Sequence, residues 1–260
     1  MTARTGRATT PADLSHALAA VASAPRLLVV CDFDGTIAPI VDDPSAATPD
    51  PRAVAHLLAL ADLPGTSVAL LSGRSLASLA ALSGFGDAGT AVRLVGSHGA
   101  EHAESDAHPS AAVLELVDRT RAVTAPFDGV ELEPKPHGVA VHVRRAAQPD
   151  AALAAVTAFA ESTDLHVLHG KLVIELSLVR VDKGDAFRVL LADSLADRAV
   201  VLGDDVTDES TFAAARPVDV TIKVGDGDTQ ARHRVHDVAG AVEALRQLSE
   251  ARASWASSVR

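Results

Sequence analysis

The sequence contains no tyrosine, and cysteine, methionine and tryptophan each occur only once among its 260 residues. Because Cys31 is the single cysteine, no disulfide can form within the chain, which favours a reducing compartment. No apolar run approaches the roughly 20 residues that span a bilayer. The polar stretch from Met1 to Thr10 also lacks the apolar core of a secretory signal. We therefore expect a cytoplasmic protein without a membrane as its partner.

Positive charge is scarce as well, since 23 lysines and arginines stand against 34 aspartates and glutamates, a formal net charge of −11. This balance disfavours nucleic acid as a partner, because nucleic acid is bound by basic surfaces. A small anionic substrate remains compatible, since it needs only a local group of cations. The apolar share of 48% permits a large hydrophobic core. The oligomeric state stays open, and a monomer is compatible with these features.

One short segment carries the strongest local signal. The run from Leu27 to Cys31 is unbroken and apolar, which is typical of a strand buried on both faces of a parallel sheet. Asp32-Phe33-Asp34-Gly35-Thr36 follows directly, so two carboxylates lie where the strand ends. Ligands of open α/β sheets bind at the carboxyl ends of the strands. Paired acids there suit a cation and a phosphate, although in isolation an ordinary acidic strand-to-loop junction would look the same.

The segments around this strand predict the fold class. Helical and strand patterns alternate up to about residue 100 and again from Asp182, which predicts a doubly wound parallel sheet, a Rossmann-like core of the α/β class. The intervening segment has the order αββαββ, and Gly138–Arg144 alternates as an antiparallel strand with one wet face does. We expect a mobile tail at 1–12, a core domain at 13–103 and 181–260, and an inserted α+β domain at 104–180.

Polar side chains follow the predicted parallel strands at four places. Each of these signals is weak alone, since Ser-Gly-Arg and Lys-Gly are common and an acidic run also suits the start of a helix. Their joint occurrence at the carboxyl ends of strands in one sheet favours a shared site. The four groups are Asp32 with Asp34, Ser72, Lys183, and Asp204 with Asp205 and Asp208.

In this order the motifs DxDGT, Ser-Gly-Arg, Lys-Gly and GDDxxDE resemble the haloacid dehalogenase superfamily of phosphotransferases. Within it, the chain resembles the trehalose-6-phosphate phosphatase family from about residue 26 to about residue 225. With no tyrosine in the chain, His142-Val143-Arg144 stands where that family usually has His-Tyr-Arg. The further shared motifs are Ser97-His98-Gly99-Ala100-Glu101, Glu133-x-Lys135, His142-x-Arg144, and Gly170-Lys171 with Glu175.

The resemblance implies a covalent phosphatase mechanism, which splits a very slow hydrolysis into two steps. Asp32 would be the nucleophile, Asp34 the general acid and base, and Lys183 a catalytic cation that offsets repulsion between anions. Asp32, the backbone carbonyl of Asp34, and Asp204 would hold Mg²⁺. The remaining implied roles are phosphate binding by Ser72, Gly73 and Lys183, support of the ligands by Asp205, Asp208 and Thr36, and sugar-phosphate binding by Arg74, Glu101, Lys135, His142, Arg144, Lys171 and Glu175.

The resemblance points to hydrolysis of trehalose 6-phosphate, with the inserted domain as a cap that selects the sugar. A phosphatase for another sugar phosphate, or a sugar phosphomutase, remains an alternative with the same motifs. A phosphoacceptor signalling module also uses acids, a lysine and an aspartyl phosphate, but it needs no inserted αββαββ unit and no second aspartate. A sugar-binding protein without catalysis is least favoured, because it has little reason to combine Asp32, Asp34 and Lys183.

Overall fold

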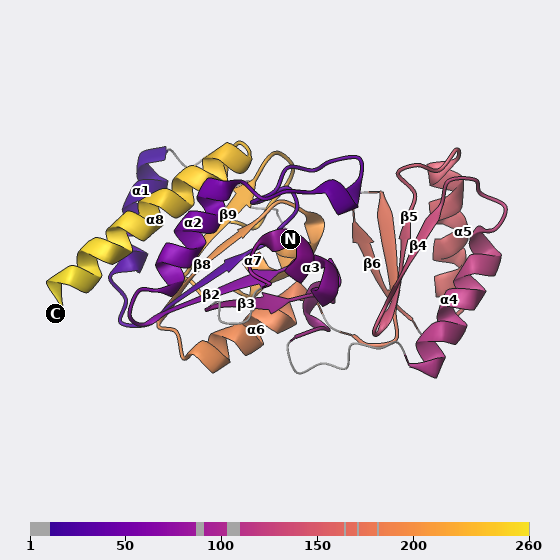
Figure 1. Cartoon of the computed structure of the whole chain (residues 1–260), viewed down its shortest axis with the longest axis horizontal. Helices are drawn as coiled ribbons and strands as arrows, with labels where there is room; N and C mark the ends of the chain where they lie inside the picture. The colour runs from indigo at the N-terminus through magenta and orange to yellow at the C-terminus, as the bar shows by residue number, and fades with distance from the viewer. Residues whose placement is uncertain are drawn as a thin grey trace, which may run out of the picture.

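The computed structural model describes residues 11–86, 91–102, 110–163, 165–170, 172–180 and 182–259. These residues form a six-stranded sheet and a four-stranded sheet, each covered by helices. The two units lie side by side along the longest axis of the molecule (Figure 1). The α/β class expected from the sequence is confirmed.

The larger sheet has the strand order β10-β9-β8-β1-β2-β3, and all neighbouring strands are parallel. Strand β1 (Leu27–Cys31) therefore lies in the interior of the sheet, between β2 (Thr66–Leu71) and β8 (Arg198–Gly203). All five residues of β1 are buried, as its unbroken apolar sequence predicts. The other strands are β3 (Val92–Val95), β9 (Val220–Val224) and β10 (His233–Val235).

Helices cover both faces of this sheet, which is the doubly wound arrangement (Figure 1). Leu27 and Val29 of β1 belong to the hydrophobic cluster on one face, and Leu28 and Val30 to the cluster on the other. The first face is covered by α1 (Pro11–Ala22), α2 (Pro51–Ala61), α3 (Leu76–Ser83) and α8 (Val238–Ser258), and the second by α6 (Lys183–Ser194) and α7 (Glu209–Ala214).

The second unit follows the predicted order αββαββ. Its sheet is antiparallel with the order β4-β5-β7-β6, and helices α4 and α5 pack on one face. Val139, Val141 and Val143 are buried in that helix-covered cluster. The opposite face, which the sequence predicted to be wet, carries buried Ala140 and half-buried His142 and Arg144, because it lines the cavity toward the core. The elements are α4 (Ala111–Thr124), β4 (Glu131–Lys135), β5 (Gly138–His142), α5 (Pro149–Glu161), β6 (His166–Gly170) and β7 (Val173–Ser177).

Local capping residues begin the core helices at defined positions. Asp50 accepts a hydrogen bond from the amide of Arg52 and is followed by Pro51, so α2 begins there. Three short 3-10 helices, Pro44–Ala46, Ser97–Gly99 and Val206–Asp208, connect longer elements on the side where the parallel strands end. Across the described ranges, every helix is too short or too polar to cross a bilayer.

Candidate active site

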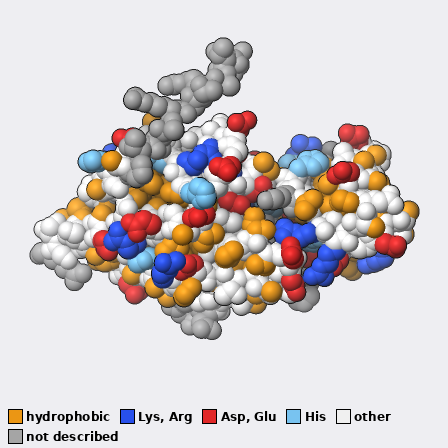
Figure 2. All heavy atoms as spheres, turned by 90° about the horizontal axis from the view of Figure 1, so that it is seen from above, with side chains coloured by type: hydrophobic (Ala, Val, Ile, Leu, Met, Phe, Trp, Pro, Cys, Tyr) orange, Lys and Arg blue, Asp and Glu red, His pale blue; other side chains and the backbone are white. Residues whose placement is uncertain are grey.

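A cavity of about 900 Å³ lies between the ends of the parallel strands and the antiparallel sheet. The face shown in Figure 2 is hollowed between the two units, and acidic side chains lie on the core side of this hollow. Residues of both units line the cavity, among them Asp32 and Asp204 from the core and Glu133 and Glu175 from the smaller unit. The site expected from the sequence therefore coincides with the junction of the two units.

Lys183 lies between two carboxylates at the core side of this cavity. Its Nζ is 3.0 Å from Oδ1 of Asp32 and 2.8 Å from Oδ1 of Asp208. Asp182 caps α6 by accepting a hydrogen bond from the amide of Asp185, so that Lys183 is the first residue of the helix. Lys183 is 2% exposed, and both carboxylates are buried as well. The ammonium group thus neutralises two acids where water screens charge poorly.

Asp204 follows β8 and meets Asp32, which follows the adjacent strand β1. Asp32, Asp204 and Asp208 each contribute one carboxylate oxygen to an acidic group, and these three oxygens all lie within 4.8 Å of one another. Hard oxygen ligands at such spacing fit a divalent cation such as Mg²⁺. Asp208 already accepts hydrogen bonds at both oxygens, from Lys183 and from the amide of Asp205. Asp32 and Asp204 are therefore the better candidates for metal ligands.

Gly35 leaves room for the carboxylate of Asp204. A Cβ atom added at Gly35 would lie 1.9 Å from Oδ2 of Asp204, and the backbone φ of Gly35 is +71°. Both the contact and the left-handed conformation require glycine. The amide of Gly35 donates to the carbonyl of Ala38 at 2.7 Å, so the turn after β1 folds back on itself. The glycine of the DxDGT motif thus brings β1 and β8 residues together.

The crowding of acids changes their ionisation. Burial raises the pKa of Asp32 well above its usual range, although Lys183 acts in the opposite direction. Burial, together with Asp208, raises the pKa of Asp204 to about 7. Burial alone would lower the pKa of Lys183, but Asp208 and Asp32 outweigh it and raise the value. Carboxylates in this state are stabilised by an added cation.

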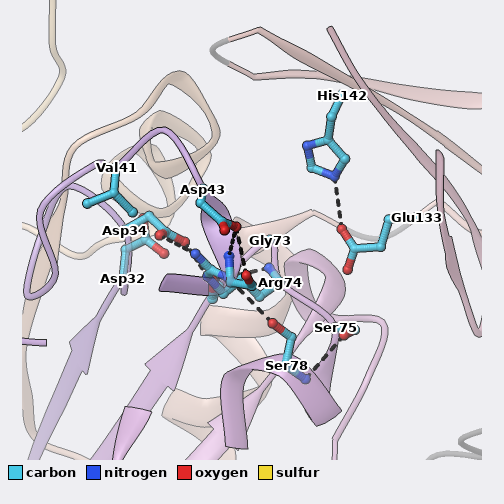
Figure 3. A network of polar contacts seen from close by, with 12 residues as sticks. Asp32, Asp34, Val41, Asp43, Gly73, Arg74, Ser75, Ser78, Glu133 and His142 are labelled. Atoms are coloured by element: carbon cyan, nitrogen blue, oxygen red, sulfur yellow. Dashed lines mark hydrogen bonds and ion pairs between the residues drawn. The ribbon is translucent and has the colours of Figure 1, made fainter. Parts of the chain in front are cut away.

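Arg74 contacts both carboxylate oxygens of Asp34 (Figure 3). The Nε to Oδ2 and Nη2 to Oδ1 distances are both 2.7 Å. The guanidinium carbon also lies 5.3 Å from the centroid of the Phe33 ring, which is within the range of a cation–π contact. Sequence reasoning assigned Arg74 to the substrate, and in this structure its partner is Asp34.

Ser72 and Gly73 follow β2 and meet the turn Ser97–Gly99. Ser72 is buried, and its Oγ accepts a hydrogen bond from the amide of Arg74 at 3.2 Å. Ser97 and His98 have φ values of +45° and +55°, which are uncommon for residues other than glycine. A Cβ atom at Gly73 would lie 2.6 Å from Cε1 of His98. The strained turn therefore packs the imidazole against a glycine of the predicted phosphate loop.

Lys135 and Glu175 join the antiparallel sheet to the core. Nζ of Lys135 is 2.5 Å from Oε2 of Glu175 and donates to the carbonyl of Gly73 at 2.5 Å. Nε2 of His98 lies 3.5 Å from the same carboxylate oxygen. Burial alone would raise the pKa of Glu175, but Lys135 and His98 lower it to about 2. Burial lowers the pKa of His98, so an ionised Glu175 faces a neutral imidazole at neutral pH.

A second contact between the units involves Arg144, which follows β5. Its Nη1 donates to the carbonyl of Val41 at 2.6 Å, in the loop that follows the DxDGT motif. On the same wall of the cavity, Nε2 of His142 lies 3.0 Å from Oε2 of Glu133 (Figure 3). Two cationic side chains of the smaller unit, Arg144 and Lys135, thus each bind a backbone carbonyl of the core.

Three of the sequence-predicted residues lie outside the cavity lining, and one cannot be placed. Glu101 is buried and accepts hydrogen bonds from Oγ of Ser97 and from the amide of Leu76. Thr36 is fully buried, and Asp208 acts through Lys183. Lys171 lies outside the described residues. The predicted residues that do line the cavity are Asp32, Asp34, Ser72, Gly73, Arg74, Lys135, His142, Arg144, Glu175, Lys183, Asp204 and Asp205.

Some residues at the site received no role from sequence reasoning. His98, Glu133 and Thr207 line the cavity. Lys223 lies below it, in the buried strand β9, and its Nζ donates to the backbone carbonyl of Asp204. A signal existed for Lys223, because it is the only charged residue of a segment that otherwise reads as a buried strand. His98 belongs to the shared motif Ser97-His98-Gly99-Ala100-Glu101, but that motif did not indicate its contact with Gly73, which depends on the turn after β3.

Comparisons with known proteins show which family this chain is similar to. The family model for trehalose-phosphatase matches residues 30–243. A trehalose-phosphate phosphatase of Mycobacterium marinum is 39% identical over 229 residues, which cover 78% of this chain and 56% of that protein. The trehalose-6-phosphate phosphatase of Escherichia coli is 31% identical over 218 residues, covering 80% of each chain. The chain thus spans little more than half the length of the mycobacterial relative.

A solved structure shares the fold. The C-terminal domain of the Candida albicans trehalose-6-phosphate phosphatase superposes with a TM-score of 0.77 at 24% identity, covering 96% of this chain and 99% of that domain. The family model covers the strand ends that carry Asp32, Ser72, Lys183 and Asp204, as well as the whole αββαββ unit. The chain belongs to the trehalose-phosphatase family of the haloacid dehalogenase superfamily.

Proposed function

We propose that this chain is a Mg²⁺-dependent phosphatase that releases trehalose and inorganic phosphate from trehalose 6-phosphate. The observation that carries the proposal is the arrangement of Lys183 between Asp32 and Asp208, with Asp204 beside them, at one wall of a cavity shared by two units. Family membership supports the reaction class, and the names of the relatives support the sugar.

Asp32 is the nucleophile in this mechanism. One of its carboxylate oxygens attacks phosphorus, the bond from phosphorus to the sugar oxygen breaks, and an aspartyl phosphate forms. Lys183, 3.0 Å from Asp32, reduces the repulsion between the anionic nucleophile and the anionic substrate. Asp208 keeps the ammonium group in place through its 2.8 Å hydrogen bond. Ser72 donates a hydrogen bond from its hydroxyl group to a phosphoryl oxygen.

Asp34 moves the protons. It donates one to the departing sugar oxygen and later takes one from the water that hydrolyses the aspartyl phosphate. Arg74 holds both carboxylate oxygens of Asp34, which suits the ionised form needed for the second step. For the first step the protonated carboxyl group must loosen from Arg74, because a carboxylic acid accepts two such hydrogen bonds poorly.

The donor set fits a hard cation, and we propose Mg²⁺. Asp32 and Asp204 would hold the cation through carboxylate oxygens of the 4.8 Å group, and the backbone carbonyl of Asp34 would be a third protein ligand. When bound, Mg²⁺ supplies positive charge to the phosphoryl oxygens. Asp205 supports this arrangement, because its backbone amide donates a hydrogen bond to Oδ2 of Asp208.

We further propose that the segment 104–180 is a cap that covers the site and selects the sugar. A disaccharide presents many hydroxyl groups, and the cap side of the cavity carries paired charges that can bind them, in Glu133 with His142 and in Lys135 with Glu175. Closing the cap over the phosphate excludes bulk water from the aspartyl phosphate. A cytoplasmic location stays a prediction.

Phosphate release from a panel of sugar phosphates tests the proposal. We expect the highest kcat/KM for trehalose 6-phosphate, with sucrose 6-phosphate and glucose 6-phosphate well below it. A ranking with trehalose 6-phosphate below either one would assign the enzyme to another sugar. Excess chelator should abolish turnover in every case, and activity that survives it would remove the metal from the mechanism.

Two variants test the residue roles. Asp32→Asn should fold and show no turnover, and steady-state activity in it would exclude Asp32 as the nucleophile. Asp193→Asn is a matched control, because Asp193 is an exposed acid paired with Arg93 far from the cavity lining. Asp34→Asn separates the alternatives, since a phosphoacceptor module would keep slow autophosphorylation whereas a hydrolase loses turnover.

A further inference from the structure

Lys223 is a buried cation that the mechanism above does not use. It is the penultimate residue of β9 (Val220–Val224), where all five residues are buried, and only 4% of its surface is exposed. Taking an ammonium group out of water is unfavourable by several kcal/mol unless nearby groups compensate for it. A lysine at such a position therefore needs a specific partner.

That partner is the backbone of a candidate metal ligand. Strand register places Lys223 beside Gly203, the last residue of β8, and its Nζ donates to the backbone carbonyl of Asp204, the next residue. On its other side, the carboxylate of Asp204 occupies the space that a Cβ atom at Gly35 would fill. The peptide and the carboxylate of Asp204 are thus fixed by different neighbours.

Lys223 does not line the cavity, although the next residue, Val224, does. A direct contact with a substrate is therefore not its role. Its position behind Asp204 also differs from that of Lys183, which binds the carboxylate oxygens of Asp32 and Asp208 directly. Lys223 acts on the cluster of Asp32, Asp204 and Asp208 only through the backbone carbonyl of Asp204.

The charges of the site are compatible with one divalent cation. Five carboxylates, those of Asp32, Asp34, Asp204, Asp205 and Asp208, carry a formal charge of −5 when ionised. Among the described residues, three cations contact these five, Lys183, Arg74 and Lys223, and contribute +3. The difference of −2 is the charge that Mg²⁺ would neutralise. Lys223 therefore lowers the repulsion among the acids without occupying the space between their oxygens.

We propose that Lys223 is a positioning residue, which fixes the peptide of Asp204 so that its carboxylate faces Asp32 and the divalent cation. This inference rests on the proposed function only in requiring that the acidic group binds a divalent cation. Groups that orient metal ligands from behind commonly change metal affinity by about tenfold to a hundredfold when they are removed.

The sign of the effect separates positioning from charge. At a pH well above the pKa of Asp204, where its carboxylate is ionised with or without Lys223, removal of a charge that acted only by repulsion would strengthen the binding of Mg²⁺. If it positions Asp204, its removal weakens binding despite the loss of that repulsion. The two roles therefore predict opposite changes in the dissociation constant.

Calorimetric titration of metal-free protein with Mg²⁺ alone, at a pH well above the pKa of Asp204, tests the proposal. Lys223→Met should weaken binding by about tenfold to a hundredfold relative to wild type. Thr221→Val is the matched control, because Thr221 is a buried polar residue of the same strand whose Oγ1 accepts a hydrogen bond from the amide of Arg232. The control should bind Mg²⁺ as wild type does. Equal or tighter binding by Lys223→Met, or an equal loss in Thr221→Val, would overturn the proposal.

A second variant, Lys223→Gln, and a second measurement, kcat at saturating Mg²⁺, keep the proposal testable if Lys223→Met misfolds. If Lys223→Met does not give the circular dichroism spectrum of wild type, Lys223→Gln takes its place, because its shorter neutral side chain cannot reach the same carbonyl. Saturating Mg²⁺ should restore kcat in either variant with KM unchanged, and a loss of kcat that excess Mg²⁺ does not repair contradicts a positioning role. Wild-type protein that binds no Mg²⁺ would overturn this proposal. If Lys223→Met binds Mg²⁺ more weakly than wild type, but wild type does not hydrolyse trehalose 6-phosphate, only the proposed function is overturned.

Discussion

Arg74 and Asp34 are 40 residues apart in the chain and form a two-point contact, with Nε–Oδ2 and Nη2–Oδ1 distances of 2.7 Å each. The side chain of Arg74 is largely buried, at 12% exposure, whereas that of Asp34 is 37% exposed and faces the cavity. The fork of the guanidinium group fixes the plane of the carboxylate as well as its position. Arg74 thus sets the direction from which Asp34 exchanges protons.

Arg74→Met should lower kcat by about tenfold to a hundredfold, because a misplaced general acid and base loses most of its effect. Steady-state kinetics of Arg74→Met, Asp34→Asn and the double variant measure the coupling. The double variant should be no slower than Asp34→Asn, because Arg74 acts through that carboxylate. Fully additive losses would show that Arg74 has an independent role such as binding phosphate. Arg93→Met, which breaks only the exposed pair with Asp193, is the control.

Gly35→Ala should abolish binding of a divalent cation, because the added Cβ would take the place of the Asp204 carboxylate. The matched control is Gly225→Ala. Gly225 has a φ of +77°, close to the +71° of Gly35, but a Cβ atom there meets nothing within 4 Å. Both variants lose about 1–2 kcal/mol through backbone strain, and only Gly35→Ala loses the site. Calorimetric titration with Mg²⁺ distinguishes them, and equal affinity in the two variants would refute the steric argument.

Breaking the pair between Lys135 and Glu175 should destabilise the protein strongly. Both residues are buried, so Glu175→Gln or Lys135→Met leaves one charge without its partner, an effect of about 3–5 kcal/mol. The exposed pair of Arg145 with Glu131 is the control, and its removal should change stability by at most about 1 kcal/mol. Denaturant unfolding monitored by circular dichroism gives both free energies. Similar losses in the two pairs would contradict the assigned burial.

Affinity for Mg²⁺ should rise with pH up to at least about pH 7, since the pKa of the other candidate ligand, Asp32, is raised as well. Burial, with Asp208 as the second cause, raises the pKa of Asp204 to about 7, and Mg²⁺ binds only the ionised carboxylate. Each pH unit below this value should weaken binding by about tenfold as one proton competes. Calorimetric titrations between about pH 5 and pH 8 measure the dependence. A flat profile across this range would show that Asp204 is already ionised.

The raised pKa of Asp204 can also be tested with metal-free protein. Between about pH 4 and pH 7 the folded protein holds a proton on Asp204 that the unfolded chain has released, so the metal-free protein should lose stability as pH rises through this window. Asp204→Asn removes the titrating group and should flatten the slope of the unfolding free energy against pH. A wild-type slope no different from that of Asp204→Asn would contradict the raised pKa.

Local sequence patterns predicted much of the core and of the site. An unbroken apolar run in β1 and acids directly after it are enough to place Asp32 at the edge of a parallel sheet, because the carboxyl ends of parallel strands share one edge. The alternation of Val139, Val141 and Val143 likewise indicated an antiparallel strand with one buried face. These features depend on residues close together in the chain.

Long-range contacts could not be predicted in the same way. The pairing of Arg74 with Asp34 and that of Arg144 with the carbonyl of Val41 depend on how loops from different strands meet. Strand β10 has only three residues and an unremarkable composition, so no periodicity marked it. Glu101 belongs to a shared family motif, yet its carboxylate accepts hydrogen bonds from Oγ of Ser97 and from the amide of Leu76. Motif membership alone does not say which way a side chain points.

The position of β1 between β2 and β8 has a consequence for the order of folding. Strand β2 follows β1 after one short 3-10 helix and α2, whereas β8 is made only after the entire αββαββ unit and α6. During synthesis, one edge of the most apolar strand therefore stays unpaired until the intervening unit, which has its own hydrophobic cluster, has left the ribosome. Closing such a distant pair is slow, so refolding should be limited by docking of β8, and nascent chains that stall before it would expose an aggregation-prone edge.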